Sequence, residues 1–164
     1  PDIDSRNLSI RRLFYRPVMK FTHQLCERAL NNRNLDLFDR YGVKTTFYCC
    51  ALALERNTEV AREIVARGHE VCGHGYRWQE YHSMDRSSEL ESIRKTVTSL
   101  ETTTGQRPVG WFTRYGPSVN TRDLIAQEPG FLYDSCSMND DLPYFVTAGH
   151  KPWLVLPYSK RRYY

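Results

Sequence analysis

The chain has 164 residues, a length that favours one domain with a sizeable core. Hydrophobic residues make up 40% and charged residues 26% of the chain, which is ordinary for a folded protein and argues against intrinsic disorder. No apolar run approaches the roughly 18 residues of a membrane-spanning helix, and the first residues show no secretory signal pattern. We therefore expect a cytoplasmic protein that has no membrane partner.

The formal net charge of +4 comes from the two ends of the chain. Residues 1–44 carry 9 Lys or Arg against 5 acidic residues, residues 45–150 carry 10 against 14, and residues 151–164 carry 4 against none. The middle of the chain therefore lacks a basic face interleaved with aromatic residues, and we expect no nucleic-acid partner.

The five cysteines form an odd set without a C-x-x-C pair, which argues against a zinc knuckle and against a complete disulfide framework. Three of them lie in apolar, strand-like runs, where a small buried hydrophobic residue is a more common role than a catalytic nucleophile. We expect free thiols at Cys26, Cys49, Cys50, Cys72 and Cys136.

The hydrophobic pattern predicts helices and strands that alternate along most of the chain. Residues 1–16 show no clear period, and a helix is possible from about residue 19 to residue 41 although asparagines interrupt it. Further on, the pattern predicts strands over 43–50, 69–72, 109–113, 131–133 and 153–156, and helices over 58–67, 85–105 and 121–127. Strands that recur about every 30 residues predict right-handed βαβ units, a parallel sheet or barrel, and thus an α/β fold.

His74 is the strongest candidate for a chemical role. It follows the predicted strand 69–72 directly, and Gly73 and Gly75 on either side leave its imidazole unshielded. The carboxyl edge of parallel strands is where α/β folds place their active sites. We predict that His74 transfers a proton, whereas His69, inside the strand, is predicted to be structural.

Other candidates have structural alternatives of similar weight. Arg114 carries a permanent charge on a rigid fork, so it could meet a substrate carbonyl or an oxyanion, or it could form a surface ion pair. Trp78 and Tyr81 could line a flat heterocycle or pack in the core. Asp134 could act at the site or cap a turn. The pair Asp140 and Asp141 could orient a histidine or accept substrate N–H groups, or it could simply be a solvated loop.

Several segments in collinear order over roughly residues 35–158 resemble the polysaccharide deacetylase (NodB-homology) superfamily. They are Thr45-Thr46-Phe47-Tyr48, Gly68-His69-Glu70-Val71, His74-Gly75-Tyr76, Thr104-Gly105-Gln106-Arg107-Pro108-Val109-Gly110-Trp111 and Gly130-Phe131-Leu132-Tyr133-Asp134-Ser135. Three segments are more similar to the allantoinase-like branch related to the PuuE-type enzymes: 74–78, 116–122 and 139–144.

The resemblance implies a single NodB-like domain over residues 1–164, with a distorted (β/α) barrel of fewer than eight repeats. It also implies a hydrolase of non-peptide C–N bonds that takes a small-molecule substrate, most directly a cyclic ureide. The alternatives are a metal-dependent N-deacetylase that acts on an N-acetyl sugar, and a relative that only binds. The resemblance implies catalytic roles for His74, Arg114, Asp140 and Asp141, and substrate binding by Trp78, Tyr81 and Tyr144.

Two departures from the family pattern change these expectations. Sugar deacetylases of the superfamily hold a divalent metal with one aspartate and two histidines four residues apart, but here His74 is followed by Trp78. Indole offers no lone pair to a metal, so we expect no cofactor, and zinc only if the chain is a sugar deacetylase.

The second departure concerns the family's general-base carboxylate, which lies on its first strand. Nothing in residues 1–44 resembles that strand, and the chain also ends abruptly after residue 158. We therefore expect an incomplete barrel whose first strand and C-terminal repeats are missing. Such a chain should be feebly active by itself, and its exposed strand edges favour self-association, with a homo-oligomer expected at full length.

Overall fold

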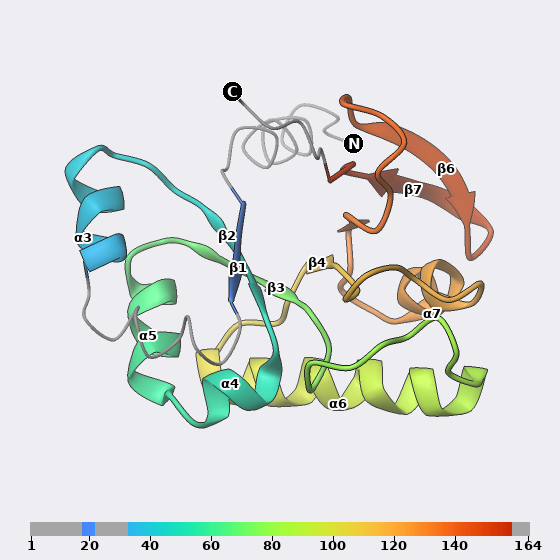
Figure 1. Cartoon of the computed structure of the whole chain (residues 1–164), viewed down its shortest axis with the longest axis horizontal. Coiled ribbons are helices and arrows are strands. Elements are labelled where there is room, and N and C mark those ends of the chain that lie inside the picture. Colours follow the sequence, from blue (N-terminus) through green and yellow to red (C-terminus); the bar gives the residue numbers. More distant parts are fainter. Residues whose placement is uncertain (1–17, 22–32, 159–164) are drawn as a thin grey trace, which may run out of the picture.

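A mixed, mostly parallel sheet of seven strands forms the centre of the computed structural model, which describes residues 18–21 and 33–158 (Figure 1). The strand order is β1-β2-β3-β4-β5-β7-β6, and every neighbouring pair is parallel except the antiparallel hairpin β6–β7. The strands are β1 (Val18–Phe21), β2 (Thr46–Cys49), β3 (Glu70–Gly73), β4 (Gly110–Trp111), β5 (Tyr133–Asp134), β6 (Tyr144–Ala148) and β7 (Lys151–Val155). The predicted α/β fold is confirmed.

The helices of the described part are α3 (Arg33–Arg40), α4 (Ala51–Glu55), α5 (Thr58–Ala66), α6 (Arg86–Thr104) and α7 (Thr121–Gln127). The long helix α6 runs along the bottom of the view below the strands, with α4 and α5 on the left and α7 on the right (Figure 1). The sequence determines both ends of α6, because the Asp85 side chain accepts the Ser88 N–H at 2.9 Å and Gly105 adopts a left-handed φ of 72°. None of these helices is long and apolar enough to cross a membrane.

The two faces of the sheet have different neighbours, because successive side chains of a strand point to opposite faces. On one face Phe47 and Val71 pack with α3 to α6 in one core cluster, and Trp111 and Trp153 pack with α6 and α7 in another. On the opposite face a smaller cluster contains Tyr48, Cys72 and Phe112, with Tyr158 packed against it.

Two sequence expectations are wrong in the N-terminal part. Val18–Phe21, where the expected helix was to begin, is instead a strand that pairs in parallel with β2, and in the described residues a helix follows at Arg33–Arg40. A strand therefore does precede Thr45, contrary to the expectation that none would. The remainder of that predicted helix, residues 22–32, lies outside the described residues, as does Cys26. The other four cysteines are buried free thiols, as predicted.

Candidate active site at the carboxyl ends of the central strands

His74 lies immediately after β3, where the backbone is held in place by its neighbours. Its N–H donates to the Cys49 carbonyl at 3.0 Å, which extends the pairing of β3 with β2 by one residue. The next residue, Gly75, has a φ of 86°, and a Cβ there would lie 2.8 Å from the Tyr81 hydroxyl. Only glycine suits this turn, and the turn directs the chain away from the strand directly after the imidazole.

The imidazole of His74 is oriented by a backbone carbonyl and by aromatic rings. Its Nδ1 lies 2.7 Å from the carbonyl oxygen of Phe112. A carbonyl can only accept, so Nδ1 carries the hydrogen, and in the neutral ring Nε2 is the nitrogen that can accept a proton. The ring stacks on Phe112 with a centroid distance of 5.1 Å and meets Trp78 edge-to-face, also at 5.1 Å. The side chain is only 1% exposed, so His74 is an oriented, shielded base. The expectation that the flanking glycines leave its imidazole unshielded is wrong, because the rings of Phe112 and Trp78 pack against it.

Arg114 follows β4 and lies next to the same tryptophan. Its guanidinium carbon is 5.0 Å from the centroid of the Trp78 ring and 4.4 Å from that of Tyr115. One terminal nitrogen donates to the Trp78 carbonyl and the other to the Tyr115 hydroxyl, each at 3.0 Å. Within residues 33–158 no carboxylate forms an ion pair with it, and its buried Nε has no hydrogen-bond partner there. The Arg114 guanidinium therefore remains a positive charge that can bind an anionic oxygen.

The structure thus brings together three of the predicted site residues: His74, Trp78 and Arg114. Trp78 connects the other two, since its ring contacts both the imidazole and the guanidinium and its carbonyl holds the guanidinium. Its side chain is 40% exposed, which leaves indole surface for a ligand. We refer to His74, Trp78, Phe112, Arg114 and Tyr115 as the His74 cluster.

The two other predicted substrate-binding residues lie in different surroundings. Tyr81 is 0% exposed and packs edge-to-face on Trp111. Its hydroxyl forms a hydrogen bond of 2.8 Å with the Ser92 hydroxyl. Burial raises the pKa of Tyr81 to about 12. It is a core residue here, and its burial does not support the predicted role in substrate binding. Tyr144 begins β6, is half-buried, and donates to the Asn139 side chain at 2.8 Å.

The acidic candidates fall into two groups. Asp140 and Asp141 are exposed in the loop between β5 and β6, where the Asp140 carboxylate accepts the N–H groups of Asp141 at 2.7 Å and Leu142 at 3.1 Å. Asp134 is fully buried and accepts from Arg122, from the Trp153 indole and from a turn N–H. Its capping and ion-pair contacts are structural.

Two members of the His74 cluster are absent from the residues predicted to act at the site. Phe112 contributes its carbonyl and its ring to His74, and Tyr115 contributes its hydroxyl and its ring to Arg114. Tyr115 has a φ of 62°, which is rare for a bulky residue. Phe112 lies near the end of the predicted strand 109–113 and Tyr115 in the polar turn that follows it, and these positions were the only signal in the sequence for either residue.

The described side chains around His74 do not fit a divalent metal. Aromatic rings surround the imidazole, and indole cannot take the place of a second histidine ligand. In the part of the chain that the structure describes, no three His, Cys, Asp or Glu side chains gather in a way that could hold an ion.

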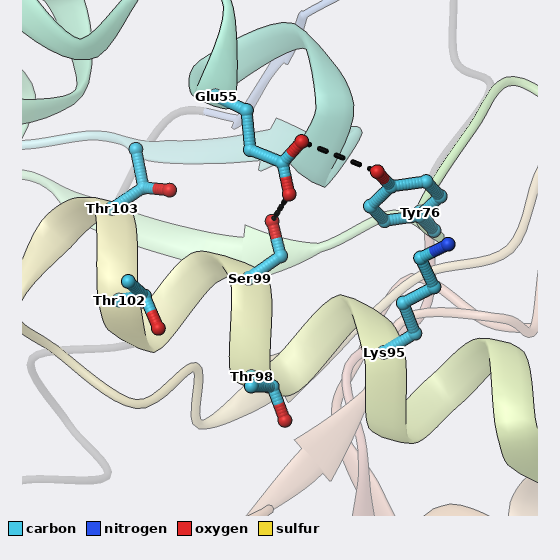
Figure 2. A pocket seen from close by; sticks show the side chains of 7 residues that line it. All are labelled: Glu55, Tyr76, Lys95, Thr98, Ser99, Thr102 and Thr103. Atoms are coloured by element: carbon cyan, nitrogen blue, oxygen red, sulfur yellow. Dashed lines mark hydrogen bonds between the residues drawn. The ribbon is translucent and has the colours of Figure 1, made fainter.

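A groove of about 540 Å³ lies elsewhere, on the helical side of the sheet between α4 and α6. Figure 2 shows the residues that line it, among them Glu55, which accepts from the Ser99 hydroxyl at 2.6 Å and from the Tyr76 hydroxyl at 3.2 Å. The Lys95 ammonium lies 4.0 Å from the centroid of the Tyr76 ring. No residue of the His74 cluster lines this groove, so it is separate from the candidate site.

The chain is similar to known proteins over most of its length. The family model described as polysaccharide deacetylase matches residues 17–133. A peptidoglycan deacetylase from Helicobacter pylori is 30% identical over 128 residues, which cover 77% of this chain and 43% of that protein.

Two solved structures share both fold and sequence with the chain. A probable polysaccharide deacetylase from Pseudomonas aeruginosa PAO1 has a TM-score of 0.70 and 48% identity over 77% of this chain and 43% of its own. A PuuE allantoinase has a TM-score of 0.74 and 38% identity over 93% of this chain and 48% of its own. The chain spans less than half the length of these relatives. From the match over residues 17–133, the chain belongs to the polysaccharide deacetylase family.

Proposed function

We propose that this chain carries the catalytic core of an allantoinase-like hydrolase, which opens a cyclic ureide by adding water across a ring amide bond. The observation that carries the proposal is the contact between His74 and Trp78, because an indole stands where sugar deacetylases of the resembled superfamily have a metal-binding imidazole. The similarity to the PuuE allantoinase, which extends over 93% of this chain, supports the same branch.

The proposed reaction begins when water attacks a ring carbonyl carbon of the ureide. As the C–O bond forms, Nε2 of His74 takes a proton from the water, and the carbonyl electron pair moves onto its oxygen. The guanidinium of Arg114 meets this negative charge. When the intermediate collapses, the ring C–N bond breaks and the leaving nitrogen recovers the proton from His74. The product is the ring-opened ureide with a new carboxyl group, which ionises in water.

The geometry of the His74 cluster supports these roles. The hydrogen bond from Nδ1 to the Phe112 carbonyl leaves Nε2 as the basic nitrogen, so no rotation or change of tautomer is needed before proton transfer. The exposed part of Trp78 offers a flat apolar surface next to both reacting groups, which suits a planar heterocycle.

A second candidate is a metal-dependent N-deacetylase that acts on an N-acetyl sugar. It is favoured by the similarity to the peptidoglycan deacetylase and by the 48% identity to the structure from Pseudomonas aeruginosa PAO1. This candidate requires a metal, so the purified chain should bind zinc tightly and with defined stoichiometry. The allantoinase-like proposal instead expects that Trp78→His, which restores an imidazole four residues after His74, binds zinc more tightly than the wild type.

The deciding experiment measures hydrolysis of allantoin and of an N-acetylglucosamine oligomer by the wild type, His74→Ala and His82→Ala. His82 is a matched control, since its side chain is 60% exposed. We expect the wild type to hydrolyse allantoin only, and weakly, in line with the feeble activity expected of this chain. His74→Ala should lose about 100-fold to 10,000-fold of that activity, the usual contribution of a positioned base, and His82→Ala none. Turnover of the sugar alone would favour the second candidate. Equal inactivity of all variants, with no binding of allantoin by calorimetry, would refute the proposal for this chain.

A further inference from the structure

We propose that Tyr115 is a positioning residue that holds the Arg114 guanidinium ready for the oxygen on which negative charge develops. The inference rests on the proposed role of Arg114 and adds the residue that fixes its position. Tyr115 is adjacent to Arg114 in sequence, and its ring and hydroxyl both contact the guanidinium.

The backbone of Tyr115 is in an unfavourable conformation. Its φ of 62° lies in the left-handed region, where a side chain with a Cβ is strained and glycine is not. In the described residues only His150, with a φ of 63°, is another non-glycine residue of this kind. Strained conformations of bulky residues persist when surrounding contacts determine them, and they occur often at functional sites.

Burial of the Tyr115 ring does not offset this strain, because the side chain is 69% exposed. The loop is instead held from its two ends. Just before the tyrosine, the Arg114 carbonyl accepts the Gly116 N–H at 2.7 Å. Just after it, the hydroxyls of Ser118 and Thr121 donate to the carboxylate of Glu89, which is 0% exposed. The ring lies against the guanidinium, 4.4 Å from its carbon, rather than in the core.

The result is a guanidinium held between two rings with part of its donor set unused. Trp78 and Tyr115 lie 5.0 Å and 4.4 Å from its carbon, and each also accepts one hydrogen bond from a terminal nitrogen. A guanidinium has five N–H donors, and among the described residues only two of them, on the terminal nitrogens, are used, so the other terminal N–H groups lie in a fixed plane where a ligand oxygen can meet them. Holding a flexible arginine in place before the substrate binds reduces the entropy lost on binding. The ligand class that fits is a planar amide or ureide, whose carbonyl oxygen can meet the fork between the rings.

The test uses the complete 164-residue chain and three variants: Tyr115→Gly, Tyr115→Phe and His150→Gly. His150 is the matched control, because it is exposed, has the same backbone conformation, and lies in the β6–β7 turn. Each variant is measured for thermal unfolding midpoint, for the NMR shifts of the Arg114 side chain, which report nearby rings, and for the dissociation constant of allantoin.

We expect Tyr115→Gly to keep or raise the unfolding midpoint, as His150→Gly does, because glycine relieves the strain. Only Tyr115→Gly should shift the Arg114 signals towards those of a solvated arginine. It should also weaken allantoin binding by about tenfold, through the lost ring contact and hydrogen bond. Tyr115→Phe should retain the ring-dependent shifts and weaken binding by a smaller factor.

Failure of the inference and failure of the proposed function give different results. Unchanged Arg114 signals in Tyr115→Gly would overturn the positioning role, whatever happens with allantoin. A lower unfolding midpoint in Tyr115→Gly than in His150→Gly would also overturn it, because the ring would then stabilise the fold. If the wild type does not bind allantoin, the proposed function fails, and the NMR shifts alone decide the role of Tyr115.

Discussion

Replacing Asp134 with asparagine tests the polar group that joins β5, β7 and α7 beside the candidate site. The Asp134 carboxylate is 0% exposed and receives four hydrogen bonds. Oδ1 accepts from a terminal nitrogen of Arg122 at 3.2 Å and from the Cys136 N–H at 2.9 Å. Oδ2 accepts from Arg122 Nε at 2.8 Å and from the Trp153 indole at 2.7 Å. An asparagine of the same size can retain only one of these two acceptor atoms.

The loss in the free energy of unfolding can be worked out from the contacts that Asp134→Asn removes at Oδ2. An amide nitrogen there would face two N–H donors, so one charge-assisted hydrogen bond is lost, which costs about 1.5 to 3 kcal/mol. The indole N–H of Trp153 would stay buried without an acceptor, and this costs about 1 to 3 kcal/mol. The Arg122 side chain is 32% exposed, so water recovers part of its loss. We expect the free energy of unfolding to fall by about 3 kcal/mol.

Urea unfolding followed by fluorescence measures this change through the midpoint and slope of the transition. The control is Asp123→Asn, which changes an exposed carboxylate in the first turn of α7, the helix that carries Arg122. It should change the free energy of unfolding by at most about 0.5 kcal/mol. If Asp134→Asn lowers the free energy of unfolding no more than this control, the hydrogen bonds of the carboxylate do not stabilise the fold as inferred.

Three further predictions concern packing, thiols and acid stability. A Cβ on Gly110 would lie 2.2 Å from the Tyr133 ring, so Gly110→Ala should cost about 1 to 3 kcal/mol in urea unfolding, whereas Gly116→Ala, which meets nothing within 4 Å, should cost almost nothing. Burial raises the pKa of Cys136 to about 12, so DTNB at mildly alkaline pH should react with the buried thiols only after unfolding. Serine hydrogen bonds lower the pKa of Asp85, so its stabilising effect is complete above the ordinary carboxyl range and is lost as pH falls through the lowered value. The difference in thermal unfolding midpoint between Asp85→Ala and the wild type should therefore shrink as the pH is lowered.

Local sequence signals predicted the elements whose ends are chemically marked. Helix α6 has a capping aspartate, an apolar stripe and a terminal glycine, and its observed bounds agree with that pattern. Strand β1 has no such residues at its ends. It is only four residues long, and it is a strand because it pairs in parallel with β2, a tertiary contact that local sequence does not show. Strand β6 was also not predicted, although Gly149 and His150 form a hairpin turn that could have indicated it.

The site was predictable where side chains follow parallel strands, and not where they lie in irregular backbone. His74 and Arg114 both follow such strands, and the sheet brings them to the same edge. Tyr81 lies in the segment between β3 and α6, which has no repeating geometry, so nothing in the sequence showed that it points into the core. The contribution of Tyr115 depends on one backbone angle, which its residue type disfavours and local propensity would not predict.

The proposed chemistry divides between two residues the work that one metal ion does in metal-dependent hydrolases. A bound ion both activates water and stabilises the developing negative charge, so a single position can serve both purposes. In the His74 cluster these tasks fall to separate groups, an imidazole for the proton and a guanidinium for the charge. Two groups are effective only if their separation is fixed, and Trp78 contacts both of them. The residue that removes a metal ligand is therefore also the one that holds the two replacement groups together, so a change at position 78 should disturb both at once.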